Sequence, residues 1–178
     1  MPATPARPPD AMRTALLLLT AIFPAACALV EPAYVYVDSI ASDHAGPQES
    51  YFLFSGRPGL ATDNRQFRRY SDSADEALQA AGLRKVDAVG EADMVVGFVY
   101  GVEAVRDGNV TRRTSFVEFA AFDWNEVRDH GDRNAIWRTR AYMDGSHGGL
   151  SRVVPMLVEA CTPWLGKSTG GIVEVEFD

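Results

Sequence analysis

Asp144, Ser146 and His147 are the three residue types of a nucleophilic triad, and they lie within one short, glycine-rich segment. A serine hydrolase holds its serine at a fixed angle to a base that a third group orients, so its triad is assembled from separate parts of a fold. This segment contains no Gly-x-Ser-x-Gly elbow that would present the serine rigidly. We therefore expect a flexible turn here. A hydrolase centred on Ser146 and His147 is a third alternative, which activity surviving in Ser146→Ala would exclude.

Residues 165–170 (LGKSTG) are similar to the end of a phosphate-binding P-loop. The first glycine of that motif would have to occupy position 161, which is Cys161. Phosphate binding also needs a strand before the loop and a helix after it, whereas this segment follows a predicted helix and precedes a predicted strand. The pattern indicates the end of a helix followed by a turn, and we expect no nucleotide.

Metal binding would have to use His44, His130 and His147, with carboxylates such as Asp129 and Asp132. None of the histidines shows the paired spacing, such as His-x-x-x-His, that places two ligands on one helix face. All three fall in predicted loops, where a solvated side chain is the simpler interpretation. We expect no metal and no cofactor.

Cys27 follows a segment with the plan of a secretory signal. One cation, Arg13, is followed by an apolar block at residues 15–23 and by small residues directly before the cysteine. The block is too short for a membrane-spanning helix, which needs roughly 20 residues, and Pro24 interrupts its end. The proline-rich residues before Met12 are unlike the start of a signal, so we take Met12 as the true start.

Pro24, Ala25, Ala26 and Cys27 together resemble a bacterial lipobox, with proline at a position that usually carries leucine. The resemblance implies that the Cys27 thiol receives a diacylglycerol thioether and that cleavage exposes its amino group for a further acyl chain. Two or three acyl chains anchor stably, because burial is worth about 0.8 kcal/mol per CH₂. The alternative is a generic cleavage site, and a mass spectrum showing an unmodified N-terminus after Cys27 would exclude lipidation.

The chain is thus expected to give a signal peptide, residues 1–26, and a single lipid-anchored periplasmic domain, residues 27–178. The mature chain holds 15 basic and 23 acidic residues, a net charge of −8 against −7 for the whole sequence. An acidic body offers no basic face for nucleic acid and disfavours lying flat on anionic lipid. Two cysteines are too few for a disulfide framework, and the length suffices for one hydrophobic core.

Hydrophobic periodicity predicts an α+β domain, with a mostly antiparallel sheet of about five or six strands and two helices packed on one face. One helix is expected to begin at Ser73, which has the spacing of a capping box to Glu76, and to end at Gly82. The second is expected over residues 150–165, with Cys161 buried on its core face as a small hydrophobe. The expected strands are 34–37, 51–54, 92–100, 114–124, 135–143 and 172–177, with a polar loop at 128–134.

Aromatic residues crowd the strand predicted at 114–124. Most of them are expected in the core, because large apolar side chains usually pack inward. If the sheet were open on one side, they could instead line an apolar groove for a lipid or a partner peptide. The residues of that groove would be Phe116, Phe119, Phe122, Trp124 and, from the second helix, Val154.

Several short words follow one another along the chain: residues 80–83 (AAGL), 91–96 (EADMVV), 153–158 (VVPMLV) and 165–168 (LGKS), with Trp137 in a late strand. With the lipobox, they resemble a bacterial lipoprotein family known only as domain of unknown function 4136. The resemblance covers about residues 51–177. It implies an α+β envelope lipoprotein with no assigned activity, and it carries over no functional residue.

We expect a lipid-anchored cell-envelope lipoprotein that serves as a structural or interaction module and not as an enzyme. Its partners would be the membrane, through the N-terminal anchor, and an envelope protein. The alternative is a periplasmic carrier of an apolar ligand, which a continuous pocket or co-purifying lipid would indicate. Ala28 stands where an aspartate often marks inner-membrane retention, so we expect the outer membrane, with the domain facing the periplasm.

Overall fold

The computed structural model describes residues 33–43, 48–59, 62–131, 133–145 and 149–177. The chain divides into two units, Met1–Glu31 and Pro32–Asp178, and the described residues all belong to the second. The signal segment and Cys27 lie outside the described residues. None of the helices in the described ranges is long and apolar enough to cross a membrane.

The described residues of the second unit form one mixed sheet of seven strands, in the order β3-β2-β4-β5-β6-β1-β7. Antiparallel pairing joins β4 to β5, β5 to β6, β6 to β1 and β1 to β7, whereas β2 runs parallel to β3 and β4. The α+β class and the mostly antiparallel sheet are confirmed, but five or six strands are too few. The strands are β1 Ala33–Ala41, β2 Ser50–Ser55, β3 Arg84–Lys85, β4 Met94–Asp107, β5 Val110–Asp123, β6 Trp137–Asp144 and β7 Val173–Phe177.

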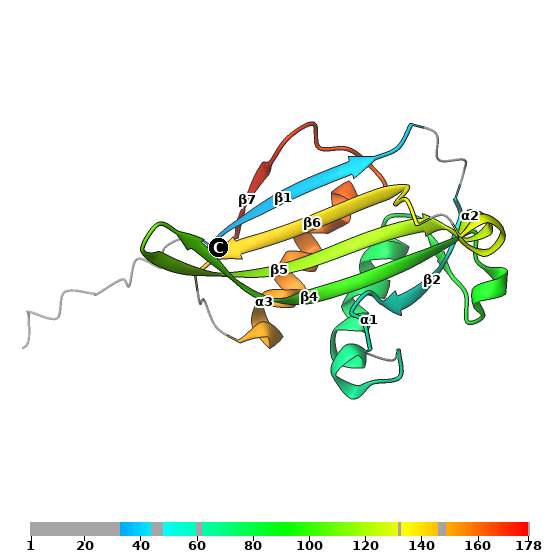
Figure 1. The fold of residues 1–178 in the computed structure, drawn as a ribbon, viewed down its shortest axis with the longest axis horizontal. Helices are drawn as coiled ribbons and strands as arrows, with labels where there is room; N and C mark the ends of the chain where they lie inside the picture. The colour runs from blue at the N-terminus through cyan, green and yellow to red at the C-terminus, as the bar shows by residue number, and fades with distance from the viewer. Residues whose placement is uncertain (1–32, 44–47, 60–61, 132, 146–148, 178) are drawn as a thin grey trace, which may run out of the picture. The chain divides into compact units, whose positions relative to one another are not determined.

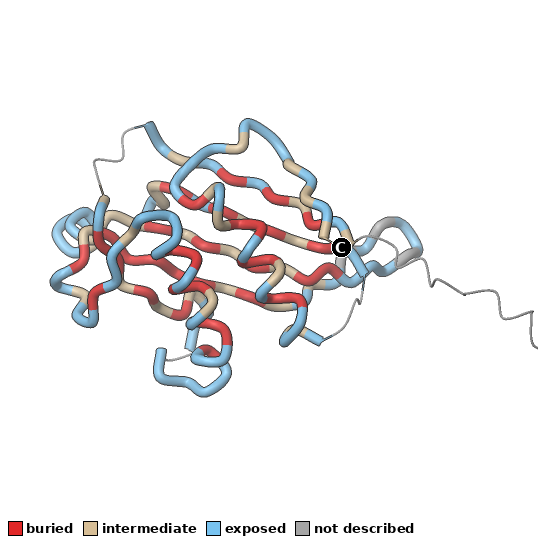
Figure 2. Tube along the Cα trace, turned by 180° about the vertical axis from the view of Figure 1, so that it is seen from behind, coloured by how far each residue is buried: buried red, intermediate tan, exposed pale blue. Residues whose placement is uncertain are grey.

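Helices α1 (Arg65–Ala80) and α3 (Leu150–Cys161) pack on the same face of this sheet, as expected. The strands cross in front of both helices in Figure 1, and in Figure 2, seen from behind, the buried positions lie where helices and sheet meet. A third helix, α2 (Trp124–His130), follows β5 at one end of the sheet and is not predicted by the sequence patterns. Two short 3₁₀ turns, Val89–Glu91 and Thr162–Trp164, complete the described helical structure.

The first helix begins earlier than its capping-box pattern predicts. Its N-cap is Asn64, whose side-chain oxygen accepts a hydrogen bond at 2.8 Å from the backbone N–H two residues on. Ser73 lies inside the helix, where its hydroxyl donates to the Tyr70 carbonyl, so the prediction of a helix start at Ser73 is wrong. Phe67 and Tyr70 are buried and extend the apolar stripe. Tertiary packing of that stripe stabilises a first turn that the local sequence marks only weakly.

The last three residues of α2, 128–130, lie in the segment predicted as a polar loop, and its first, Trp124, lies at the predicted end of a strand, which is a second correction. Asp123 caps the helix by accepting hydrogen bonds from the backbone N–H groups of Asn125 and Glu126, and Gly131 ends it with φ at 68°. No residue of α2 is buried. Without an apolar stripe the helix has no periodic signal, and its two caps are the local features that specify it.

The hydrophobic core fills the layer between the sheet and the two packed helices. Phe98, Phe119 and Leu157 are each at most 1 % exposed, and the rings of Phe98 and Phe119 on neighbouring strands are 4.9 Å apart. Alternate side chains of the same strands point to the opposite face. Among the described elements no helix covers that face (Figure 1), and we call it the open face.

Asp93, directly before β4, connects that strand to β2 and should make stability depend on pH. Its Oδ2 atom accepts hydrogen bonds from the Ser50 hydroxyl at 2.7 Å, the Ser50 N–H at 2.8 Å and the Glu49 N–H at 3.2 Å. The bonds from Ser50, first from its hydroxyl and then from its N–H, lower the pKa of Asp93 below its ordinary value of 3.8. The carboxylate therefore stabilises the fold above that ordinary value, and this contribution is lost as the pH falls through the lower, folded-state pKa.

We expect Asp93→Asn to be less stable than the wild type at neutral pH and the difference to shrink on acidification to about pH 3. Urea unfolding at several pH values would measure both. Asp72→Asn, an exposed carboxylate on α1, is the control and should show little difference at any pH. A difference between wild type and Asp93→Asn that stays constant with pH would contradict the role assigned to Asp93.

Candidate functional site

An aromatic row crosses the middle of the open face. Gly101, Phe116, Tyr142 and Tyr36 are successive cross-strand partners on β4, β5, β6 and β1. The rings of Tyr36 and Tyr142 stack, with centroids 5.4 Å apart and planes inclined by 28°. A Cβ atom at Gly101 would lie 3.4 Å from the Phe116 ring, so the glycine leaves room for that ring to lie over β4.

Arg140, on β6, organises the charges beside this row. Its guanidinium forms an ion pair with Glu103 of β4 and lies 3.9 Å from a carboxylate oxygen of Glu118 on β5. The same guanidinium stands over the Phe116 ring, 4.8 Å from its centroid. Arg138 approaches Glu118 at 3.6 Å. These pairs are partly exposed, so their contribution to folding is small, and they position the Arg140 fork against an aromatic surface.

The Tyr36 end of the row lies beside a carboxylate of a neighbouring strand. Glu174 of β7 is the cross-strand partner of Tyr36. The negative charge of Glu174 raises the pKa of Tyr36 above its ordinary value of 10.0. A tyrosine with the ordinary pKa is already protonated at neutral pH, and the raised pKa of Tyr36 extends the range in which its hydroxyl is a hydrogen-bond donor to higher pH.

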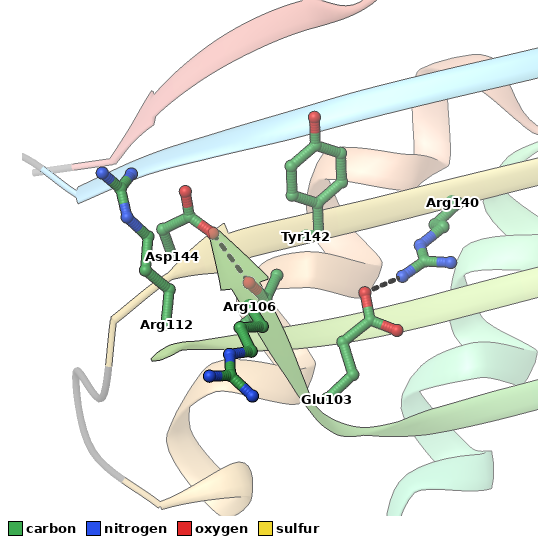
Figure 3. A pocket seen from close by; sticks show the side chains of 7 residues that line it. Glu103, Arg106, Arg112, Arg140, Tyr142 and Asp144 are labelled. Atoms are coloured by element: carbon green, nitrogen blue, oxygen red, sulfur yellow. Dashed lines mark hydrogen bonds and ion pairs between the residues drawn. The ribbon is translucent and has the colours of Figure 1, made fainter. Parts of the chain in front are cut away.

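A polar hollow of about 460 Å³ opens on the open face next to the aromatic row. Side chains from β4, β5 and β6 line it (Figure 3), and within it the Thr114 hydroxyl donates to Asp144 at 2.8 Å. Of the three arginines in the lining, Arg140 is paired with Glu103, whereas neither Arg106 nor Arg112 forms an ion pair with any side chain that the structure describes. The lining residues are Glu103, Arg106, Arg112, Thr114, Arg140, Tyr142 and Asp144.

This arrangement suits hydrogen bonding and charge recognition. Guanidinium groups offer planar forks to carboxylates or phosphates, and the two carboxylates of the hollow accept from donors. Within the described ranges, no group of three or more His, Cys, Asp or Glu side chains is arranged to hold a metal ion. The hollow can therefore bind polar groups of a partner or ligand through charge pairing.

The five residues of the expected apolar groove are not brought together. Phe119 and Val154 are fully buried in the layer between sheet and helices. Phe116 and Phe122 are each three residues from Phe119 on the same strand, and residues separated by an odd number point to opposite faces. Both therefore lie on the open face, where they are partly exposed. Trp124 begins α2 at the end of the sheet. The expected groove needs these aromatic residues on one surface. Side chains alternate between the two faces of a strand, so the aromatic residues are divided between the core and the open face.

The other candidates for chemistry are placed only in part. Ser146, His147, His44 and Cys27 lie outside the described residues. His130 is exposed at the end of α2, where its Nδ1 atom lies 2.9 Å from the Glu126 carboxylate. It has the solvated position expected for it.

The segment that resembles a P-loop end serves to join the second helix to the sheet. After the turn Thr162–Trp164 the chain passes to β7, and the Ser39 hydroxyl of β1 lies 2.7 Å from the Lys167 carbonyl and 3.1 Å from the Trp164 carbonyl. Gly166 adopts a φ of 73° in this turn. Helix, turn and strand follow in the order expected from the sequence, and the segment contacts β1 through its carbonyls.

Cys161 is fully buried on the core side of α3, as predicted. Burial raises the pKa of its thiol well above the ordinary value of 9.0, which keeps it protonated and unreactive. In the acylated chain we expect no reaction of Cys161 with a thiol-specific disulfide reagent under native conditions and full reaction in denaturant. Rapid modification of the folded protein would contradict this burial.

Apart from Phe116 and Asp144, which the sequence patterns single out for other roles, the site consists of residues that these patterns do not single out. Alternation in the strand at 135–143 places Arg138 and Arg140 on its wet side, and Tyr142 and Asp144 continue the same alternation. That pattern could have identified the β6 contribution. Glu103 and Arg112 belong to other strands, and only the pairing register brings them to the same hollow.

No family model matches the sequence, and no curated protein matches it. Solved structures do share its fold. A PDZ domain protein from Parabacteroides distasonis is 10% identical and aligns over 82% of this chain and 39% of its own, with a TM-score of 0.51.

Two further structures are similar over most of their own length. A PelC dodecamer from Paraburkholderia phytofirmans is 17% identical over 72% of this chain and 96% of its own, with a TM-score of 0.41. A DUF4136 family protein from Bacteroides thetaiotaomicron is 11% identical over 70% of this chain and 91% of its own, with a TM-score of 0.41.

Proposed function

We propose that this chain is a lipid-anchored cell-envelope lipoprotein that binds a protein partner on the open face of its sheet. The observation that carries the proposal is the cluster of Tyr36, Phe116, Arg140 and Tyr142 at the middle of that face. Tyrosine and arginine dominate the energetic centres of protein interfaces. A ring of partly exposed charges around such a centre is the usual composition of an interface rim.

The hollow supports a protein partner better than a small apolar ligand. Its lining contains three arginines and two carboxylates. An apolar molecule would cover Arg106 and Arg112, which form no ion pair with a described side chain, without pairing their charges, at a cost in free energy. A partner surface with its own carboxylates and amides could satisfy these groups and also cover the aromatic row. The proposal assigns no reaction to the chain.

The anchor would be the acylated Cys27, and the location the outer membrane with the domain facing the periplasm. The support is the lipobox sequence and the absence of an aspartate at position 28. Cells grown with a clickable palmitate should label the wild-type protein and not Cys27→Ala, and gradient-separated membranes should place the wild type with outer-membrane markers. An unlabelled wild-type protein would contradict the anchor, and a label confined to inner-membrane fractions would contradict the location.

Photo-crosslinking in intact cells tests the partner. A benzophenone amino acid at Tyr142 should give a discrete adduct, and the same group at Glu159, exposed on α3, should not. Arg140→Ala should reduce the Tyr142 adduct several-fold while leaving the protein folded, because the Arg140 pairs are partly exposed. Equal adducts from both positions, or an adduct indifferent to Arg140→Ala, would contradict a specific interface on the open face.

A further inference from the structure

The β4–β5 hairpin extends past the end of the sheet at which the described chain begins. Arg113 on β5 pairs with Ala104 and accepts a hydrogen bond at 2.9 Å from the Gly145 N–H, just after β6. Tyr36 pairs with Tyr142, and their strands are antiparallel. Ala33, three residues before Tyr36, therefore lies opposite Gly145, three residues after Tyr142, in the same row. The hairpin continues for three more residues, to Asp107, and so projects roughly 10 Å beyond this row. Figure 1 shows it reaching past the start of β1 and the end of β6.

This hairpin tip, residues 105–113, is basic in an acidic protein. It contains Arg106, Arg112 and Arg113 against a single Asp107, a net charge of +2, whereas the mature chain as a whole carries −8. All three arginines are exposed. Arg106 donates to the Gly108 carbonyl at 3.2 Å, and none of the three forms an ion pair with a side chain that the structure describes.

Apart from Asp107, which belongs to the tip, the carboxylates at this end of the sheet lie behind the arginines. Asp144 and Glu103 lie one residue from the row of Ala33, on the side toward the middle of the sheet. Glu176, at the sheet edge, pairs with Tyr34. Arg113 lies in the row of Ala33, Arg112 lies one residue beyond it and Arg106 two residues beyond it, so the three arginines stand roughly 3 to 10 Å in front of Asp144 and Glu103. An anionic surface that approaches this end would therefore meet a tip of net charge +2, in which Asp107 is the one carboxylate, before it meets the carboxylates of the sheet.

The anchor would bring such a surface within reach. If Cys27 is acylated, five residues separate it from the start of β1 at Ala33, and the six steps from Cys27 to Ala33 span only about 20 Å when fully extended. The end of the sheet that carries the hairpin tip then stays close to the lipid headgroups. This step rests on the lipid anchor of the proposed function.

We propose that the hairpin tip binds the headgroups of anionic phospholipids in the leaflet that holds the acyl chains of Cys27. Arg113 pairs with lipid phosphates together with Arg106 and Arg112, the two arginines of the hollow that lie nearest the tip, which leaves Arg140 and Tyr142 to the protein partner. The acidic remainder of the domain is kept away from the lipid surface. The sheet then contacts the membrane through its hairpin end. Its open face is directed along the membrane and not toward it, so a partner can reach that face.

The test uses the full acylated chain reconstituted into vesicles, with a fluorophore on Asn109→Cys at the turn of the hairpin. Cys161 is buried and does not compete for the label. Lipids with a nitroxide headgroup serve as the quencher, in vesicles of phosphatidylcholine alone or mixed equally with phosphatidylglycerol. A second label on Asn125→Cys, in α2 at the far end of β5, is the positional control.

We expect the ratio of headgroup-bound to free hairpin tips, measured by quenching of the Asn109→Cys label, to be roughly tenfold higher with phosphatidylglycerol than with phosphatidylcholine alone. Concentrated salt should reverse this effect. Asn125→Cys should show little quenching in either vesicle. Replacing Arg106, Arg112 and Arg113 by glutamine should return the Asn109 signal to its level in phosphatidylcholine. Replacing Arg65, Arg68 and Arg69, three exposed arginines on α1, by glutamine removes the same charge elsewhere and should leave the signal unchanged.

Quenching at Asn109 that is independent of phosphatidylglycerol, or that responds to the α1 substitutions and not to those in the hairpin, would overturn the proposal. Failure of the anchor gives a different result, because an unacylated chain would not float with vesicles of phosphatidylcholine alone. A chain that floats with neutral vesicles but shows no composition-dependent quenching retains its anchor and lacks the headgroup contact.

Discussion

Replacement of Phe119 by alanine is expected to lower the free energy of unfolding by about 3–5 kcal/mol. Phe119 is fully buried and lies on β5, the central strand of the sheet. Its ring packs against Phe98 at a centroid distance of 4.9 Å, between the sheet and α3. Alanine loses the transfer free energy of the ring and leaves a cavity that close-packed neighbours fill only in part. Urea unfolding followed by circular dichroism would measure the loss.

Phe116→Ala is the matched control, with the same substitution on the same strand. Phe116 is partly exposed on the open face, where it contacts the Arg140 guanidinium. We expect a loss of about 1–2 kcal/mol, from partial burial and one cation–π contact. A single groove containing both rings would give similar losses. Equal effects of the two substitutions would therefore contradict the assignment of Phe116 and Phe119 to opposite faces.

Asp75→Ala is expected to destabilise the domain by about 1–3 kcal/mol through a buried polar contact. Asp75, on α1, is 7% exposed, and Tyr51, on β2, is fully buried. The Tyr51 hydroxyl donates to the Asp75 carboxylate at 2.9 Å, and the Lys85 ammonium lies 2.5 Å from the other carboxylate oxygen. Burial, and then the charge of Asp75, raise the pKa of Tyr51, so its hydroxyl remains protonated and requires an acceptor.

The loss of stability in Asp75→Ala is moderated by what remains after the substitution. The Asp75 backbone carbonyl, 3.3 Å from the Tyr51 hydroxyl, is a longer alternative acceptor, and Lys85 is exposed enough to be solvated. A double-mutant cycle with Tyr51→Phe should show a coupling of about 1 kcal/mol. Asp72→Ala, exposed on the same helix, should change stability by less than about 0.5 kcal/mol. Additive effects of Asp75→Ala and Tyr51→Phe would contradict the contact.

Phe119→Ala and Asp75→Ala are expected to lower stability without changing the residues of the proposed binding surface. Phe119 and Asp75 hold the helices against the sheet, whereas Arg140 and Tyr142 lie on the opposite side of the same strands. Changes to the open face should therefore affect crosslinking more than unfolding. The alternation of a strand allows one element to serve both purposes.

Elements with strong periodicity could be predicted from the sequence. The closing strand alternates Val173, Val175 and Phe177 with glutamates and is found as β7. The second helix has its apolar positions at helical spacing and is found as α3, with Cys161 in the core. Burial of one face produces this spacing, so the pattern carries the information directly.

Elements stabilised by contacts with residues distant in sequence could not be predicted from the sequence. β3 is a two-residue strand, Arg84–Lys85, whose only signal is its pairing with Ser50 and Tyr51 of β2. The first two turns of α1 are rich in polar residues, and the burial of Phe67 and Tyr70 against β4 stabilises them. In both cases the stabilising partner lies elsewhere in the chain.

The sequence alone determined the α+β class, the main strands and the two packed helices, because these follow from local periodicity, and it indicated export and acylation at Cys27, because those are read from a linear segment. The tertiary structure decided which side chains share a surface. The strand period places Phe119 in the core and Phe116 on the open face, and the register of β4, β5 and β6 gathers Glu103, Arg112 and Arg140 at one hollow. Pairing register depends on contacts between distant segments, so no local pattern could assemble that site.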